Sequence, residues 1–221
     1  MTRLTAIVAF LTLARLLPAD DLSQILARMD QASVVFHSMT ADLTMVTYTA
    51  ILDDKTSENG NIEMEKGKNV TEAVVAFTGS NARTIGFFNK QIQLYTPKLN
   101  LIQIYKLAKS GKFLEQFLLL GFGASGKDLA KGYNIQLGGT EQVNGQAASK
   151  LVLTPKDLGV KEQLSQAEIW MPANSGYPIQ QKFYNSSGNY HLVTYTNFQL
   201  NPQLGPLKLN APPGTKVEYP Q

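Results

Sequence analysis

Few residues in this sequence have the types and spacing to perform chemistry, and a serine with a distant histidine is the first combination to consider. Ser125 lies in Gly-Ala-Ser-Gly-Lys, and together with His191 it would provide the nucleophile and general base of an esterase. The segment departs from the G-x-S-x-G pattern at its last position. His191 lies in an alternating strand pattern, where a hydrogen-bonded surface or core histidine is more common. We predict no enzyme and keep the esterase as a competing hypothesis.

Two further motifs have structural explanations that we prefer. Residues 121–127 match the phosphate-binding pattern G-x-x-x-x-G-K, but Asp128 follows where a Ser or Thr would hold magnesium. The segment also follows an apolar run rather than a buried strand, so we interpret it as a glycine-rich connection. Glu63 and Glu65 point the same way from one expected strand, opposite apolar neighbours. A general acid and base need two different environments in a cleft, so this pair predicts a solvated face.

The composition excludes several classes of site. The chain has 221 residues, no cysteine and two histidines, so disulfides, thiolate metal sites and thiol nucleophiles are absent. We therefore expect no catalytic residue, no metal and no cofactor. Arg3 and Arg15 supply two of the three net positive charges, which leaves +1 for the remainder. A nearly neutral chain with few arginines gives no electrostatic case for nucleic-acid binding.

Residues 1–19 are interpreted as a secretory signal peptide. A basic Arg3 precedes an apolar run that is too short to span a bilayer. Arg15 interrupts this run and Leu17 is large for its position, so cleavage is expected near Ala19 or near Ala14. A buried N-terminal helix is the competing interpretation. Export of a cysteine-free chain favours the bacterial periplasm, with residues 20–221 forming one domain.

The elements that must position any site are predicted to be one helix and many strands. Asp20 or Asp21 would cap an amphipathic helix that continues to Phe36. Alternating apolar residues then predict a series of short strands, and a change of parity after Met45 indicates a bulge or a strand covered on both faces. Turns are predicted at Asp53-Asp54 and at Asn59-Gly60, and a strand end is predicted at Pro97.

The second half of the chain adds helical segments and more strands. Residues 113–120 predict a short, almost wholly apolar helix, which we interpret as a mobile cover, and Ser125 would cap one further helical turn. Strands are predicted at 133–137, 142–144, 147–153, 167–171, 179–185 and 190–200, and the proline-rich tail is expected to be extended. The fold class is thus mainly β (α+β): a strongly curved, half-open antiparallel β-barrel of about ten strands, with helices packed in and over its concave face.

One parity of each early strand collects large apolar side chains, which an ordinary core and a ligand cavity would both require. We take the cavity as the working hypothesis. Its expected wall is Leu43, Met45, Ile62, Met64, Val75, Phe77, Ile85, Phe87, Ile92 and Leu94, with Phe113, Phe117 and Leu118 from the apolar helix. Arg83 shares a strand face with Ile85 and Phe87 and is a candidate residue of the cavity rim.

From Asp21 onward, a series of segments resembles the LolA-type periplasmic carriers of lipoproteins. The order and spacing of these segments carry the resemblance, although each match is loose. They are Gly60-Asn61-Ile62-Glu63-Met64-Glu65-Lys66-Gly67-Lys68, Phe88-Asn89-Lys90-Gln91-Ile92-Gln93-Leu94-Tyr95-Thr96-Pro97, the apolar helix 113–120, Leu151-Val152-Leu153-Thr154-Pro155-Lys156, Phe198-Gln199-Leu200 and Pro213-Gly214-Thr215-Lys216-Val217.

The resemblance implies a function without catalysis. It implies a cavity for the acyl chains of lipoproteins or another amphiphile, and shuttling of that cargo from the inner to the outer membrane. It also implies an inner-membrane ABC-type release complex and an outer-membrane acceptor as partners. We expect a monomer. The chain lacks the family's arginine after the second strand, so a divergent paralogue that binds or senses a lipid or glycolipid remains the alternative.

Overall fold

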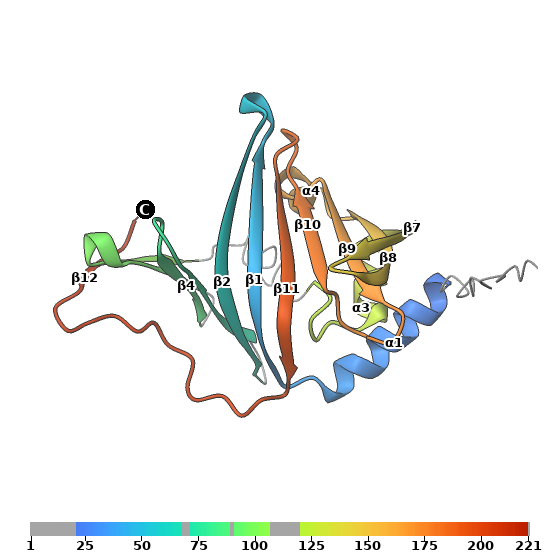
Figure 1. The fold of residues 1–221 in the computed structure, drawn as a ribbon, viewed down its shortest axis with the longest axis horizontal. Helices are drawn as coiled ribbons and strands as arrows, with labels where there is room; N and C mark the ends of the chain where they lie inside the picture. The colour runs from blue at the N-terminus through green and yellow to red at the C-terminus, as the bar shows by residue number, and fades with distance from the viewer. Residues whose placement is uncertain (1–20, 68–70, 89–90, 107–119, 221) are drawn as a thin grey trace, which may run out of the picture.

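The structure is a computed structural model that describes residues 21–67, 71–88, 91–106 and 120–220. Within these residues a large curved sheet of twelve strands forms the body of the protein (Figure 1). The strands are β1 (Ser38–Thr49), β2 (Asp54–Lys66), β3 (Thr71–Phe77), β4 (Arg83–Phe88), β5 (Gln91–Thr96), β6 (Leu101–Lys106), β7 (Tyr133–Val143), β8 (Gln146–Pro155), β9 (Gln166–Pro172), β10 (Gln180–Tyr184), β11 (Tyr190–Leu200) and β12 (Lys216–Glu218). The helices are α1 (Leu22–Val35), α3 (Gly126–Gly132) and α4 (Leu158–Gln163).

The sheet has the order β12-β6-β5-β4-β3-β2-β1-β11-β10-β9-β8-β7 and does not close. All neighbouring strands are antiparallel except β12, which runs parallel to β6. The mainly β, antiparallel and curved character was predicted from the sequence. The barrel of about ten strands was not: the structure has twelve strands in an open sheet, with β7 and β12 at its two edges.

Helix α1 begins as the sequence predicted. The Asp21 carboxylate accepts hydrogen bonds from the backbone N–H groups of Ser23 and Gln24, and the Gln24 side chain returns to the Asp21 backbone. This capping box satisfies N–H groups that the first helical turn leaves free. The buried Ile25 and Met29 then turn toward the sheet.

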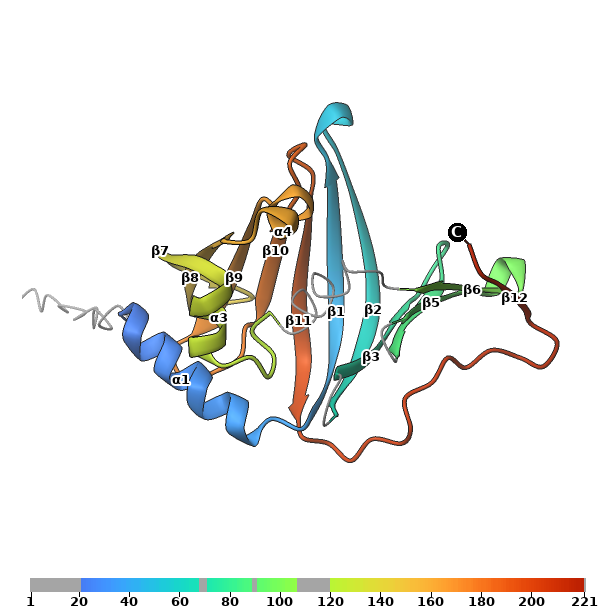
Figure 2. The same ribbon diagram turned by 180° about the vertical axis from the view of Figure 1, so that it is seen from behind.

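Helices α1 and α3 cover one part of the sheet (Figure 2). Their buried side chains join a core cluster with residues from β7, β8, β9 and β10 and from the segments beside α3 and α4. Its members are Ile25, Met29, Leu120, Leu129, Tyr133, Leu151, Leu153, Leu164, Ala167, Ile169, Met171 and Phe183. A second cluster lies around β1, β2 and β3 and includes Phe36, Met39, Met64 and Phe122. The concave face is therefore filled by helices mainly where β7 to β10 lie.

One predicted interruption of the early strands is wrong, and one of the two alternatives for another is not found. Asn59-Gly60 is not a turn, because β2 continues through both residues. A Cβ at position 60 would lie 2.4 Å from the carbonyl oxygen of Ala76 on β3, so Gly60 permits a close approach of two strands rather than a reversal. After Met45 a bulge or a strand covered on both faces was predicted, and β1 has no bulge there; its register shifts between Thr40 and Asp42 opposite β11.

The change of parity after Met45 has its explanation in packing on both faces. Tyr48 stacks on Tyr190 of β11 with ring centroids 4.9 Å apart, on the face opposite to Leu43 and Met45. The predicted reversal at Asp53-Asp54 is confirmed, since Asp53 adopts a left-handed conformation with φ of 47° after a 3-10 turn at Ala50–Leu52. The predicted end of β5 at Pro97 is confirmed as well by the 3-10 turn Pro97–Leu99.

The later part of the chain differs from prediction at two places. Residues 133–143 form one strand with an irregularity between Leu137 and Thr140, where two separate strands were expected. The short helix α4, capped by Asp157, was not predicted at all. The apolar segment 113–119 lies outside the described residues, and so does the expected signal peptide.

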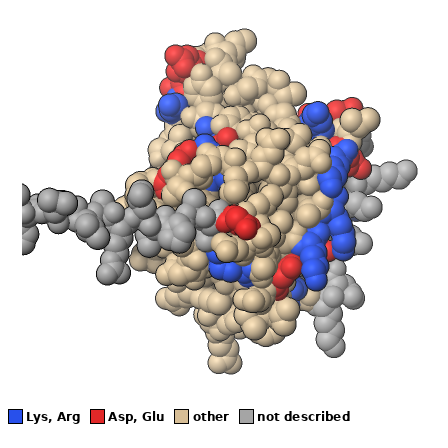
Figure 3. Space-filling model, turned by 90° about the vertical axis from the view of Figure 1, so that its right-hand side faces the viewer, with Lys and Arg blue, Asp and Glu red and all other residues tan. Residues whose placement is uncertain are grey.

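Charged side chains are unevenly distributed on the face seen from the side of α1 and β7 (Figure 3). Most of this face is occupied by uncharged residues. Lys and Arg gather along one margin, some acidic side chains lie beside them, and others lie elsewhere on the face. None of the described helices is both long and apolar enough to cross a membrane.

Candidate functional site

A cavity of about 310 Å³ opens on the concave face, over six consecutive strands of the curved sheet, β4-β3-β2-β1-β11-β10. Its wall comes from six strands: β1, β2, β3 and β4 on one side and β10 and β11 on the other. The lining residues are Leu43, Met45, Ile62, Val75, Phe77, Arg83, Ile85, Phe87, Gln181, Phe183, His191, Val193 and Tyr195. Most of this surface is apolar.

Strand register explains why these residues share one face. Ile62 lies opposite Val75, and Val75 lies opposite Ile85, so the three form a row across β2, β3 and β4. On the other side, Met45 lies opposite Val193. Side chains that are directly paired across antiparallel strands point to the same face of the sheet.

Several wall residues are only half-buried, although they are large and apolar. Met45, Val75, Ile85 and Phe87 pack against the second core cluster from its edge and keep part of their surface free. Apolar side chains in a folded core are normally in close contact on all sides. These residues instead face open space within the concave sheet, which is the arrangement that an apolar ligand requires.

The residues predicted for a cavity wall occupy three kinds of place. Leu43, Met45, Ile62, Val75, Phe77, Ile85, Phe87 and Arg83 line the cavity. Met64 is buried in the core beside it. Ile92 and Leu94 point to the same face, because they pair with Phe87 and Ile85, but they lie beyond the wall. Phe113, Phe117 and Leu118 fall outside the described residues.

The opposite wall, from β10 and β11, was missed. Gln181, Phe183, His191, Val193 and Tyr195 alternate along two strands that the sequence did predict. The available signal was this alternation. What was lacking was the pairing of β1 with β11, which brings the C-terminal strands beside the first one.

The polar side chains deep in this wall are bonded to one another. The Tyr195 hydroxyl donates a hydrogen bond of 2.7 Å to Oε1 of Gln181. The Gln181 amide nitrogen in turn donates to the backbone carbonyl of Leu120. Burial raises the pKa of the Tyr195 hydroxyl, so this group stays protonated and keeps its donor. The polar groups of Tyr195 and Gln181 thus have hydrogen-bond partners within the protein, and they leave the cavity lumen apolar.

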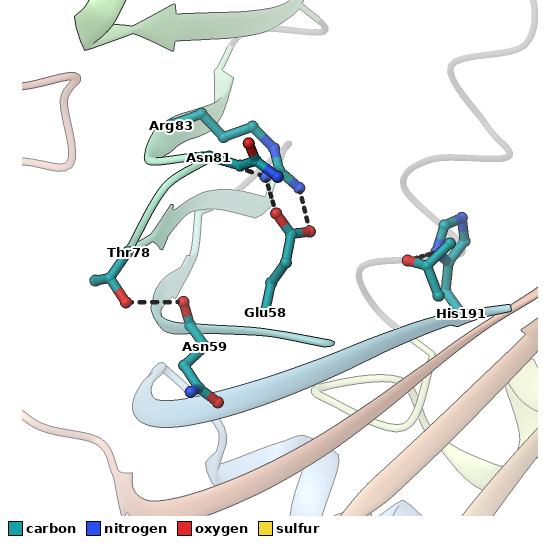
Figure 4. A network of polar contacts seen from close by, with 7 residues as sticks. Glu58, Asn59, Thr78, Asn81, Arg83 and His191 are labelled. Atoms are coloured by element: carbon teal, nitrogen blue, oxygen red, sulfur yellow. Dashed lines mark hydrogen bonds and ion pairs between the residues drawn. The ribbon is translucent and has the colours of Figure 1, made fainter. Parts of the chain in front are cut away.

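An ion pair lies at the side of the cavity formed by β2 and β4 (Figure 4). Arg83 donates from Nη1 and Nη2 to the two carboxylate oxygens of Glu58, at 2.5 and 2.9 Å. Its guanidinium also lies 4.2 Å from the centre of the Phe77 ring. The hydrogen bonds from Arg83 lower the pKa of Glu58. Arg83, expected as a rim residue, is thus a wall residue whose charge is balanced.

His191 lies at the exposed margin of the cavity, where its Nδ1 is 3.0 Å from the Thr47 hydroxyl oxygen (Figure 4). Partial burial lowers the pKa of His191, and the nearby Glu58 carboxylate opposes this shift. Ser125 has different partners: it caps α3 by accepting from the N–H of Asp128 and donates to the Asp128 carboxylate. The structure thus engages the two residues of the esterase hypothesis in separate hydrogen bonds.

Comparison with known proteins identifies the fold through structure alone. No family model matches the sequence, and a search of curated proteins found no match. Among solved structures, MucB is similar over 91% of this chain and 66% of its own, with a TM-score of 0.52 and 16% sequence identity. The chain thus spans about two thirds of MucB. At this identity the similarity concerns the fold.

Other solved structures are similar with lower TM-scores. LprF from Mycobacterium bovis has 16% identity and a TM-score of 0.49, over 84% of this chain and 96% of its own. A LolA superfamily protein from Nitrosomonas europaea has 15% identity and a TM-score of 0.41, over 84% of this chain and 96% of its own. LolA superfamily proteins, to which the sequence shows a resemblance, are therefore among the structural neighbours.

Proposed function

We propose that the protein is a non-enzymatic carrier that holds the acyl chains of a lipoprotein, or of another amphiphile, in the concave cavity. One observation carries this proposal: large apolar side chains from β1 to β4, β10 and β11 surround open space, and Met45, Val75, Ile85 and Phe87 among them remain partly unburied. Each buried methylene contributes about 0.8 kcal/mol, so an acyl chain gains much from such a cover in water.

The wall also suits reversible binding. Leucine, valine, isoleucine and methionine provide contact area without directional bonds, and methionine adapts to different shapes. The polar groups of the inner wall, Gln181 and Tyr195, bond to each other rather than offering themselves to cargo. Binding would then depend on the apolar chain, and release would need only a competing apolar environment.

The cellular setting follows from the resemblance and is part of the proposal. We place the carrier in the periplasm after removal of residues 1–19, between an inner-membrane ABC-type complex that loads it and an outer-membrane acceptor. A second candidate function is a lipid-sensing module. It is favoured by the similarity to MucB, which has been solved in complex with MucA.

The test is uptake of a fluorescent acyl probe by variants that fill the cavity. Ile85→Trp places a large side chain in the lumen, and we expect it to weaken probe binding at least tenfold while the protein stays folded. Thr84→Trp is the matched control, because Thr84 is the adjacent residue on the opposite face of β4. Equal affinity of the two variants would contradict the proposal.

A transfer assay separates the two functions. Probe-loaded protein is mixed with acceptor vesicles, and movement of the probe is followed by fluorescence. A carrier passes its ligand to the vesicles at a rate that rises with protein concentration. Retention of the ligand, together with ligand-dependent binding of a protein partner, would favour the sensing module instead.

A further inference from the structure

The charge of Arg83 is cancelled at the place where it meets the cavity. The two carboxylate oxygens of Glu58 accept hydrogen bonds from Nη1 and Nη2 of Arg83, which makes the contact bidentate. Nη1 also donates to the Asn81 carbonyl at 3.2 Å. Both side chains are largely covered, with 25% of Arg83 and 17% of Glu58 exposed. A fork of this geometry is the one that a carboxylate or phosphate ligand would otherwise occupy.

Arg83 is also the only Lys or Arg among the described residues that line the cavity. The other polar wall groups are the bonded pair Gln181 and Tyr195, and His191 at the margin, whose Nδ1 faces Thr47. An anionic ligand would therefore meet no unbalanced lysine or arginine among the described residues of this wall. At the Arg83 fork, the Glu58 carboxylate already holds both terminal nitrogens and would repel a second anion in a partly water-excluded setting, where like charges repel more strongly than in bulk water.

We propose that Glu58 determines the class of ligand, restricting the cavity to amphiphiles whose polar end carries no net negative charge. This inference rests on the proposed carrier function and adds a chemical class to it: neutral or zwitterionic acyl compounds are accepted, and anionic ones are disfavoured. Glu58 acts by occupying the Arg83 fork. The apolar wall provides the affinity, and the ion pair provides the discrimination.

The experiment compares two lysolipids with the same acyl chain, zwitterionic lysophosphatidylcholine and anionic lysophosphatidylglycerol, as competitors for a bound neutral fluorescent probe. The wild-type protein should prefer the zwitterionic lipid. Glu58→Gln frees Arg83, and we expect it to raise affinity for the anionic lipid about tenfold while affinity for the zwitterionic lipid changes little. Measurements at about 0.15 M salt keep exposed charges screened.

Two further variants make the result specific. Glu58→Gln combined with Arg83→Gln removes both charges and should restore the wild-type preference. Glu141→Gln is the matched control, because it disrupts another partly exposed ion pair, with Lys150, on the opposite face of the sheet. It should leave both affinities unchanged. Circular dichroism of each variant verifies that the fold is retained.

The outcomes separate this inference from the function beneath it. If the wild-type protein binds neither lysolipid nor the probe, both proposals are wrong. If it binds both lipids and Glu58→Gln leaves their ratio unchanged, the carrier function stands and the role of Glu58 is overturned. If Glu141→Gln shifts the ratio as strongly as Glu58→Gln, the effect is one of overall charge, and the inference also fails.

Discussion

The Tyr195 hydroxyl donates a hydrogen bond of 2.7 Å to Oε1 of Gln181, joining β11 to β10 inside the cavity wall. Gln181 is buried and uses its amide nitrogen on the Leu120 carbonyl, so Tyr195 supplies the donor to its oxygen. Tyr195→Phe would leave that oxygen unpaired. We expect a loss of about 1–3 kcal/mol in the free energy of unfolding, measured by urea denaturation.

The control for this prediction is Tyr48→Phe. Tyr48 also loses a hydrogen bond, to Asp53 at 2.9 Å, but in an exposed setting where water replaces it. Its expected cost is below about 0.5 kcal/mol. Equal costs for the two variants would mean that the bond inside the wall contributes nothing beyond an exposed one.

Tyr133 presents the opposite case. Its hydroxyl is buried without a hydrogen-bond partner in the part of the chain that the structure describes, and burial raises its pKa to about 12. Tyr133→Phe should therefore be neutral or stabilising by up to about 1 kcal/mol. Tyr177→Phe is the comparison, since the Tyr177 hydroxyl donates to the Ala32 carbonyl at 2.9 Å, and its loss should destabilise. A clear destabilisation by Tyr133→Phe would refute this expectation.

Gly60 is expected to tolerate no side chain. A Cβ there would lie 2.4 Å from the Ala76 carbonyl oxygen, a backbone atom that cannot move without disturbing the pairing of β2 with β3. Gly60→Ala should lower the thermal midpoint, with a cost of about 1–3 kcal/mol. Gly205→Ala is the control, because an added Cβ there meets no atom within 4 Å. Similar midpoints for the two variants would contradict the close approach.

His191 should make stability depend on pH. Its pKa is lowered by partial burial, against the opposing influence of Glu58, so the folded state binds a proton less readily than the unfolded state. The contribution of neutral His191 to the free energy of unfolding is fully present above the unfolded pKa of about 6.5. It is lost as the pH falls toward the folded pKa. We expect the stability advantage of wild type over His191→Gln to shrink between about pH 7.5 and pH 5.5.

Thermal midpoints at the two pH values measure this difference. Among the described residues, the charged groups that face His191 are Glu58 on β2 and, bound to it, Arg83 on β4. The hydrogen bonds from Arg83 lower the pKa of Glu58, so this carboxylate stays ionised across the range. An advantage that grows as pH falls would reverse the sign and show that Glu58 dominates the environment of His191.

Alternation along single strands could be interpreted correctly from the sequence. Leu43, Ile62, Val75 and Ile85 were assigned to one face by parity, and the register of β1 to β4 places them there. Antiparallel neighbours that follow one another in the chain have few ways to pair, so local patterns suffice. The capping box at Asp21 is equally local, because it depends on residues within one turn.

What could not be predicted depends on contacts between distant residues. Leu43 and Met45 meet Tyr195 and Val193 only because β1 pairs with β11, and no local pattern specifies that pairing. The same applies to Glu58, which no local pattern singles out and which β2 and β4 bring to Arg83 across β3. Gly60 was misinterpreted because glycine in a strand and glycine in a turn look alike without knowledge of the neighbouring strand.

The β1–β11 ladder also determines the order in which the molecule can assemble. Each of the strands β1 to β6 pairs with the next along the chain, and so does each of β7 to β11. The two series pair with each other through the β1–β11 ladder, which runs from Met39 opposite Leu200 to Tyr48 opposite Tyr190. Closing this seam requires a loop that includes most of the chain, which makes it a slow step. Until this ladder forms, β1 has an unpaired edge beside an uncovered apolar face. Partly folded molecules would aggregate through that edge. The yield of refolding should therefore fall steeply with protein concentration.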